Sequence, residues 1–360
     1  MNNHKKKDMP QSELKIAVVV DPLIKYEKWY EDLKYILNIF PNSDIFTAYY
    51  NPDLTERMFK NKKIHDTFLQ LIAPEDNQKK KWLKLEKLAY KSLRLKDYDA
   101  VISLSSRCAK YIKVTDGIKH IPIIMKPQKL FSNDRLDKQD RQYTQKLKNI
   151  IVCSLAEKRK LKKIYKVDGN VIYPPVNTKK YIPEKNLNRK EHWFLTDSNL
   201  SKRSLKLVIK SVVHAGVPLK ILGESEDAEE LIKEFKARGL VKFVGDIPRK
   251  GVISMIQNCK AYIYPTKSNT WQSSFVQVNA AGTAVIGYKR SIARELLSLD
   301  YPKTGICFEK YNYKSLSQVL TNFNIEEFDS RNCIIKAQEF DSSIFMYKLK
   351  TYVEDIVQSN

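Results

Sequence analysis

Two polar segments in the second half of the chain carry the residues best suited to bind a charged ligand. The loop Thr266–Ser274 follows an apolar run and leads into the predicted start of a helix, where free backbone N–H groups can bind a phosphate. Lys202 and Arg203 stand at the start of an earlier predicted helix, and cationic side chains of this kind form strong hydrogen bonds with phosphates. These segments therefore predict a site for a phosphate-bearing ligand.

The elements that must position these residues can be followed in the stretch Lys242–Ile286. Short apolar runs at Phe243–Val244, Ala261–Tyr264 and Ala284–Ile286 indicate strands, and apolar residues between them recur at helical spacing. Buried strands that alternate with helices are typical of an α/β fold with a parallel sheet covered on both faces. Ligands of such sheets bind beyond the carboxyl ends of the strands, which is where we expect the loop Thr266–Ser274.

Composition limits the size of the fold and the kind of partner. A chain of 360 residues with 42% hydrophobic content can form one large or two medium domains. Its net charge of +23 implies an anionic partner such as membrane lipid, nucleic acid or a nucleotide sugar. A general use of lysine as a solvated residue explains the same charge, because lysines occur in almost every segment.

Cysteine usage and the lack of targeting patterns favour a reducing compartment. The 5 cysteines are far apart and show no metal-binding spacing, which predicts free buried thiols. No signal-peptide pattern is visible, and no run reaches the roughly 18 apolar residues of a membrane span. We therefore expect a cytoplasmic protein, with peripheral binding at the inner face of a membrane as an additional hypothesis.

The segment 77–96 predicts a basic amphipathic helix. Its apolar side is expected to hold Trp82, Leu85, Leu88, Ala89 and Leu93, with lysines and arginines around it. One interpretation is an interfacial helix that binds anionic lipid. The other is a domain helix whose apolar stripe packs on the core while its lysines stay in water.

Several motifs, in order along the chain, resemble those of family 4 nucleotide-sugar glycosyltransferases, which are retaining enzymes with the two-domain GT-B fold. The matching segments are YDAVISLSS at 98–106, VIYPPVN at 171–177, NAAGTAVIGY at 279–288 and TGICF at 304–308. The resemblance implies two Rossmann-like domains whose parallel sheets face each other across a cleft.

The paired prolines Pro174 and Pro175 suit a rigid linker, so we place the domain boundary there. The expected parts are a disordered basic tail at 1–13, an acceptor-side domain at 14–176, a nucleotide-sugar domain at 177–340, and a helix at 341–360 that crosses back to the first domain.

The resemblance implies transfer of a hexose, with retention, from a nucleotide-diphosphate sugar to a glycan, lipid or protein acceptor, without a metal or other cofactor. The predicted donor-binding residues are Lys202, Arg203, Gly223, Asp246, Ile247, Asn269, Trp271, Gln272, Ser273 and Gln277. On the acceptor side we expect Asp21, Lys25 and Lys126, which follow predicted strands. An ordinary solvated lysine is the alternative for Lys25.

The chain departs from the family pattern at its most characteristic positions. The two family glutamates fall on Asn269 and Gln277, a family arginine falls on Asp197, and a family histidine falls on Met125. The loop at 24–31 also lacks the glycines of the family. Asn269 and Gln277 remain catalytic candidates, because an amide can both donate and accept hydrogen bonds with sugar hydroxyls.

Three hypotheses stay open for the function. The first is a diverged glycosyltransferase in which Arg203 or Lys267 supplies the missing positive charge. The second is a catalytically inactive GT-B pseudo-enzyme that acts as a binding or structural subunit. The third, a nucleic-acid binder, is motivated only by charge. Zinc-finger spacing, RNA-recognition signatures and a helix-turn-helix core are absent, so nucleic acid is not the expected partner.

Overall fold

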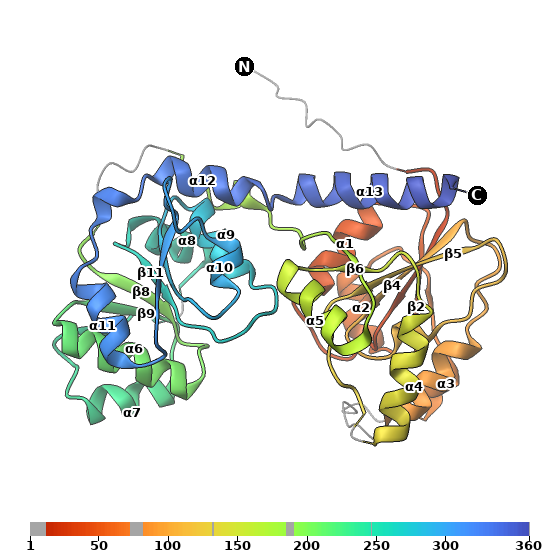
Figure 1. Cartoon of the computed structure of the whole chain (residues 1–360), viewed down its shortest axis with the longest axis horizontal. Helices are drawn as coiled ribbons and strands as arrows, with labels where there is room; N and C mark the ends of the chain where they lie inside the picture. Colours follow the sequence, from red (N-terminus) through yellow and green to blue (C-terminus); the bar gives the residue numbers. More distant parts are fainter. Residues whose placement is uncertain (1–11, 73–81, 132, 185–190, 246, 360) are drawn as a thin grey trace, which may run out of the picture. The chain divides into compact units, whose positions relative to one another are not determined.

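The computed structural model describes residues 12–72, 82–131, 133–184, 191–245 and 247–359. Their contacts divide the chain into two compact units (Figure 1). The first unit takes the chain up to Pro175 and again from Ser342 onward, and the second unit takes Val176–Asp341. This division lies one residue from the predicted boundary, whereas most of the predicted basic tail lies outside the described residues.

The first unit is built on a sheet of seven parallel strands in the order β3-β2-β1-β4-β5-β6-β7. These strands are β1 Ile16–Val20, β2 Asp44–Thr47, β3 Ile64–His65, β4 Ala100–Ser105, β5 Lys119–Ile124, β6 Ile151–Val152 and β7 Asn170–Val171. Every residue of β1 and β4 is buried, which is the pattern expected of central strands covered on both faces.

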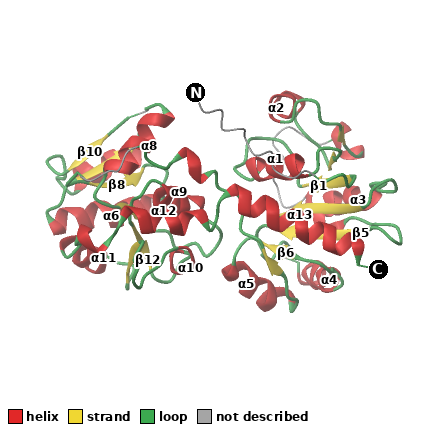
Figure 2. Ribbon diagram, turned by 90° about the horizontal axis from the view of Figure 1, so that it is seen from above, coloured by secondary structure: helices red, strands yellow, loops and turns green. Residues whose placement is uncertain are grey.

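Helices cover both faces of this sheet (Figure 2). They are α1 Tyr30–Ile39, α2 Pro52–Met58, α3 Leu83–Ser92, α4 Asp134–Gln145, α5 Leu155–Tyr165 and α13 Ser342–Gln358, with the 3-10 turns η1 Phe68–Leu71 and η3 Ala109–Tyr111. Helix α13 comes from the far end of the described chain and packs on α1 and β5. Its Phe345, Leu349 and Val353 are buried in the first unit.

The second unit has a sheet of six parallel strands in the order β10-β9-β8-β11-β12-β13. The strands are β8 Phe194–Asp197, β9 Leu219–Leu222, β10 Val241–Phe243, β11 Tyr262–Tyr264, β12 Val285–Tyr288 and β13 Gly305–Phe308. The helices are α6 Lys202–Ala215, α7 Glu226–Glu234, α8 Arg249–Asn258, α9 Ser273–Ala280, α10 Ala293–Leu296, α11 Tyr313–Thr321 and α12 Ser330–Gln338, with the 3-10 turns η4 Thr178–Lys180 and η5 Ile325–Glu327. The predicted α/β class with two parallel sheets is confirmed.

Local signals in the sequence set the ends of the elements that matter most for the site. The hydroxyl of Ser201 accepts a hydrogen bond from the backbone of Ser204 and caps α6, while Gly216 ends that helix with φ at 66°. Gly282 follows α9 with φ at 72°, a backbone conformation that other residues rarely adopt. The predicted helix end at this glycine is therefore confirmed.

Helix α3 differs from the helix predicted for 77–96. Residues 77–81 lie outside the described part of the chain, and the helix ends at Ser92. Its buried residues are Leu83, Glu86, Ala89 and Tyr90. The interpretation that packs the apolar stripe on the core is wrong at Leu85 and Leu88, which are exposed. Glu86 points inward instead, because the guanidinium of Arg107 lies 2.6 Å from its carboxylate.

Candidate functional site

A polar pocket of about 290 Å³ lies in the second unit, beyond the carboxyl ends of its central strands. Three segments form it: the turn after β8 with the start of α6, the loop after β11, and the turn after β13. The lining residues are Asn199, Leu200, Ser201, Arg203, Ser204, Tyr264, Thr266, Lys267 and Tyr311. The set contains two cations and no carboxylate, so the pocket is suited to an anion.

The start of α6 gives the pocket a second source of positive potential. The first N–H groups of a helix have no partner within the helix, and the helix dipole places partial positive charge there. The hydroxyl oxygen of Ser201 accepts a hydrogen bond from one of these groups, the backbone N–H of Ser204, at 3.3 Å. Asp197 accepts a hydrogen bond from the backbone of Asn199 at 2.8 Å, and it is absent from the pocket lining. The carboxylate that replaces the family arginine therefore lies outside the pocket.

Tyr311 holds the two cations of the pocket. The ammonium of Lys267 lies 4.1 Å from the centre of its ring, and the guanidinium of Arg203 lies 5.8 Å from it. Both distances suit cation–π contacts. In the described part of the chain neither cation has a carboxylate partner, so their charges remain available to a ligand.

The hydroxyl of Tyr311 joins the segments around the pocket. It donates a hydrogen bond to the backbone carbonyl of Pro265 at 2.8 Å and is bonded to the hydroxyl of Ser204 at 2.9 Å. Burial raises the pKa of Tyr311, so this hydroxyl keeps its proton over the whole physiological range. One side chain thus ties the start of α6 to the loop after β11.

Lys202, the predicted diphosphate ligand, points away from the pocket. Its ammonium lies 2.5 Å from Glu230 and 3.2 Å from Asp227, both on α7. Lys202 and Arg203 are neighbours at the start of α6, and successive helical residues point about 100° apart. In this structure the pocket therefore receives Arg203 and not Lys202.

The predicted donor-binding residues of the loop after β11 and of α9 have different local partners. Gln272 accepts a hydrogen bond from the hydroxyl of Tyr264 at 3.0 Å, and the amide of Gln277 lies 3.4 Å from the hydroxyl of Ser273. The side chain of Trp271 packs against Phe340. Asn269 is exposed to solvent at the tip of the loop.

Gly223, Asp246 and Ile247 were predicted to bind the donor. Gly223 has φ at 77°, and a Cβ atom there would lie 2.7 Å from the hydroxyl oxygen of Ser198. The position therefore requires glycine for packing as well as for conformation. Ile247 packs against Gly251 at the start of α8, and Asp246 lies outside the described residues. Neither Gly223 nor Ile247 lines the pocket.

Asp21, one of the predicted acceptor-side residues, holds the loop after β4 through its carboxylate. Its two carboxylate oxygens accept backbone hydrogen bonds from Ser106, Arg107, Cys108 and Ala109, at 2.6–3.0 Å, and one from the hydroxyl of Ser106 at 3.0 Å. A carboxylate offers about four lone-pair positions, so these bonds saturate it. Asp21 therefore fixes the loop after β4, whereas the predicted acceptor residues Lys25 and Lys126 are exposed.

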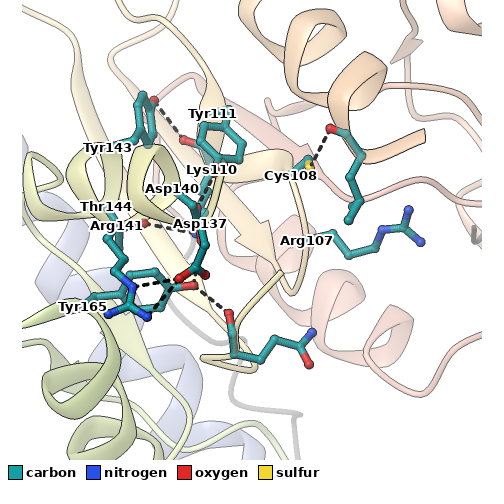
Figure 3. A network of polar contacts seen from close by, with 12 residues as sticks. Arg107, Cys108, Lys110, Tyr111, Asp137, Asp140, Arg141, Tyr143, Thr144 and Tyr165 are labelled. Atoms are coloured by element: carbon teal, nitrogen blue, oxygen red, sulfur yellow. Dashed lines mark hydrogen bonds and ion pairs between the residues drawn. The ribbon is translucent and has the colours of Figure 1, made fainter. Parts of the chain in front are cut away.

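A buried polar network continues from this loop (Figure 3). The carboxylate of Asp140 lies 2.7 Å from the ammonium of Lys110, accepts a hydrogen bond from Tyr165 at 3.0 Å and is bonded to Tyr111. Lys110 and Asp140 are both almost fully buried, so either charge would be strongly unfavourable without the other. The network joins η3, α4 and α5, and the sequence alone did not reveal it.

The described residues contain neither a metal-binding cluster nor a membrane-spanning helix. No group of three or more His, Cys, Asp or Glu side chains is placed to hold a metal ion there. In the same part of the chain, none of the helices is long and apolar enough to span a membrane.

The residues that line the pocket fall within a segment that is similar to a known domain family. Residues 177–340 match the family model of glycosyl transferases group 1. The match covers the second unit almost from end to end. No curated protein matches the sequence.

Solved structures share the fold of the whole chain at low sequence identity. Sucrose-phosphate synthase from Thermosynechococcus elongatus has a TM-score of 0.72 at 13% identity, covering 96% of this chain and 100% of that one. Anabaena HepE in complex with UDP also has a TM-score of 0.72, at 12% identity, over 94% and 99% of the two chains. The lipopolysaccharide outer core galactosyltransferase WaaB gives 0.70 at 14% identity, over 95% and 100%. The likeness shows that the chain has the GT-B fold.

Sequence reasoning missed the residue at the centre of the pocket. Tyr311 follows β13, close to the TGICF segment, and nothing in the local pattern connects it with Ser204, 107 residues earlier. Topology supplies the connection, because β13 lies at the edge of the same parallel sheet as β8 and β11. Arg203 and Lys267, the residues expected to supply charge, both line the pocket.

Proposed function

We propose that this protein is a glycosyltransferase that takes a sugar from a nucleoside-diphosphate donor, with the donor diphosphate held by Arg203, Lys267 and the start of α6. The observation that carries the proposal is the pocket itself. It combines two cations that lack carboxylate partners in the described chain with a helix N-terminus and several hydroxyls. This combination matches the charge and the oxygen acceptors of a diphosphate.

The chemistry required of these groups is stabilisation of a leaving group. When the bond between sugar and diphosphate breaks, negative charge grows on the departing phosphate oxygen. Arg203 can form two parallel hydrogen bonds with phosphate oxygens, and Lys267 adds a mobile point charge. We propose transfer with retention to a glycan, lipid or protein acceptor, in line with the family that the motifs resemble. The proposal includes no metal.

The comparisons support a nucleotide-sugar donor. The second unit, which contains the pocket, matches the glycosyl transferases group 1 model. HepE, which shares the fold, has been solved in complex with UDP and with UDP-glucose. We therefore propose that a uridine diphosphate sugar is the first donor to test.

Calorimetric titration of the purified chain with UDP, GDP and their common sugar conjugates tests this assignment. We expect one nucleotide to bind selectively, and Arg203→Gln and Lys267→Gln each to weaken its binding by about tenfold or more, since each removes a charge-assisted contact. Unchanged nucleotide affinity in both variants would show that the diphosphate does not bind in this pocket.

A variant of Lys202 distinguishes the ion pairs seen in the structure from the donor contact that the resemblance implies. If the observed ion pairs with α7 persist, Lys202→Ala leaves donor affinity within about twofold of the parent. If Lys202 turns to the donor as the resemblance implies, the same variant abolishes binding. Lys206→Ala is the matched control, because its ammonium also pairs with α7, at 2.8 Å from Glu234.

A pseudo-enzyme that binds a nucleotide sugar without transferring it is the second candidate. It is favoured by the uncharged amides of Asn269 and Gln277 at the positions of the family glutamates. Nucleotide binding that is lost in Arg203→Gln, together with no release of UDP from UDP-glucose over hours, would support this candidate. Turnover that depends on Asn269 or Gln277 would exclude it.

We also propose that the first unit docks on anionic lipid at the inner face of a membrane. Phe68, Leu71 and Ile72 lie at η1, Leu85 and Leu88 lie on α3, and all five side chains are exposed. The two elements are in contact, and we propose that the five side chains act as one apolar surface, which we call the η1–α3 surface. Lys84 and Arg94 are exposed nearby and complement lipid phosphates.

A further inference from the structure

A cavity of about 510 Å³ lies in the first unit, at the opposite edge of the sheet from the predicted acceptor residues. Lys119 opens β5, and Asn149 precedes β6, so the cavity lies at the amino ends of these strands. Asp21, Ser106 and Lys126 follow the carboxyl ends of β1, β4 and β5. The cavity is therefore separate from any site at the carboxyl edge.

The cavity is lined by aliphatic side chains and by lysines, so its charged side chains are all positive. Ile112, Val114, Ile118, Leu147 and Ile356 contribute aliphatic side chains. Lys119, Lys146 and Lys148 also line the cavity, and the described lining residues include no carboxylate. Within the described residues none of the three lysines has an ion-pair partner, whereas Lys289, Lys303 and Lys336 on the second unit all do.

The remaining polar groups of the cavity add no charge and hold it in shape. The hydroxyl of Tyr143 donates hydrogen bonds to the carbonyls of Ile112 at 2.8 Å and Lys110 at 3.1 Å, which ties the end of α4 to the segment after η3. His120 lies 2.8 Å from the hydroxyl of Ser103, and burial lowers its pKa to about 3. His120 is thus neutral at physiological pH, and the lysines alone set the charge.

From this combination we propose that the cavity binds an anionic amphiphile, a molecule with an aliphatic body and one phosphate or carboxylate head. The volume lies within the range of small-molecule sites, roughly 300–1,000 Å³. The aliphatic body would cover the apolar floor, and the head would meet the three ammonium groups, which together favour it over a neutral or cationic head. Binding here does not depend on the proposed transfer reaction.

Calorimetric titration of the full chain with three probes tests the proposal: octyl phosphate, octanol and inorganic phosphate. We expect octyl phosphate to bind at least tenfold more tightly than either of the others, because only it uses both the floor and the lysines. Equal affinity for inorganic phosphate would reduce the site to a surface anion site. Equal affinity for octanol would reduce it to an apolar groove, and failure of octyl phosphate to bind would overturn the proposal.

Two sets of variants place the binding in this cavity. Val114→Glu puts a carboxylate among the lysines and is expected to abolish octyl phosphate binding, whereas Val114→Gln, of the same size, keeps it within about threefold. The double variant Lys146→Gln/Lys148→Gln is expected to weaken binding at least fivefold, and Lys314→Gln, an exposed lysine on α11, is the control. UDP titration and thermal unfolding check that each variant is folded. Binding that is unchanged in folded Val114→Glu and in the double variant would refute the assignment.

Discussion

Tyr311 shows how much of the proposed diphosphate pocket depends on one side chain. Its ring carries Lys267 and Arg203, and its hydroxyl connects Ser204 with Pro265. Without this side chain both cations would lose the surface that orients them. We infer that Tyr311 is a positioning residue, since it acts on the ligand through the two cations.

Replacing Tyr311 separates the contribution of the ring from that of the hydroxyl. Tyr311→Phe keeps the cation–π surface and is expected to weaken nucleotide binding about three- to tenfold, the effect of one lost hydrogen bond. Tyr311→Leu removes the ring as well and should weaken it further. Calorimetric titration with the preferred nucleotide measures both. Identical affinities for the two variants would show that the ring does not orient the cations.

Asp32 is a residue of the first unit whose ionisation opposes folding. It lies in the first turn of α1 beside a small cavity lined by Ile151, Cys153 and Phe345. Burial raises the pKa of Asp32 to about 8, while Lys28 acts in the opposite direction. The folded chain therefore holds this proton more tightly than the unfolded chain, whose aspartate has a pKa of about 3.9. The free energy of unfolding should fall as pH rises from about 4 to 8.

Asp32→Asn removes this dependence, because an amide cannot ionise. We expect the variant to exceed the parent in stability by at least about 1 kcal/mol at pH 8, with a smaller gain at pH 5. Urea unfolding of the first unit at both pH values measures the difference. A gain that is equal at the two pH values would show that ionisation of Asp32 is not responsible.

The neighbouring pair Lys202 and Arg203 illustrates why residue-level assignments from sequence have a limit. Motif matching placed Lys202 on a diphosphate ligand, and the start of α6 was predicted from the same segment. Which neighbour faces the pocket is decided by α7, whose Asp227 and Glu230 attract Lys202. These carboxylates are separated from α6 in the sequence by β9, so the local sequence pattern around Lys202 does not reveal the ion pairs.

At the scale of elements, the strands were predictable and some helix faces were not. β1 is a continuous apolar run, and β4 is buried throughout although it contains Ser103 and Ser105, as expected of strands covered on both faces. α3 has two candidate faces, and the buried one contains Glu86, which is stabilised by Arg107 from the loop after β4. Such a long-range ion pair cannot be read from helical periodicity.

The η1–α3 surface yields a prediction at this same scale. Leu71 is 89% exposed and Leu88 is 57% exposed, so a charge at either position should leave the fold intact. We expect Leu71→Glu/Leu88→Glu to reduce sedimentation with vesicles of phosphatidylglycerol and phosphatidylcholine at least fivefold, because the carboxylates oppose both insertion and lipid charge.

Leu71→Gln/Leu88→Gln is the matched control for that experiment, since it removes apolar surface without adding charge. An intermediate loss is expected for it. Equal sedimentation of the parent and the glutamate variant would show that the η1–α3 surface does not bind lipid. A protein partner for this surface would then be the alternative.

At the scale of the whole molecule, the chain leaves the first unit, forms the second, and returns. The return is made by α13, whose Phe345, Leu349 and Val353 are buried against the first unit. Because α13 belongs to the first unit, the two units should differ in their response to its loss.

Deleting residues 342–360 tests this division. Exposure of three large apolar side chains is expected to cost the first unit roughly 5–9 kcal/mol, enough to unfold a typical domain. Hydrogen exchange should show protection lost in β1, β4 and β5 while β8, β11 and β12 keep theirs. Deletion of Ser359 and Asn360 alone, which lie beyond the end of α13, is the control. Loss of protection in both units together would show that they do not fold separately.

The return of α13 also sets an order of events on the ribosome. At synthesis rates of about 5–20 residues per second, roughly ten to thirty seconds pass while Val176–Asp341 is made, before the first residue of α13 appears. During that interval the sheet made first has no cover over the face that α13 will occupy. The unit encoded second can therefore complete its core first, and the nascent chain exposes apolar surface that chaperones can bind until α13 arrives.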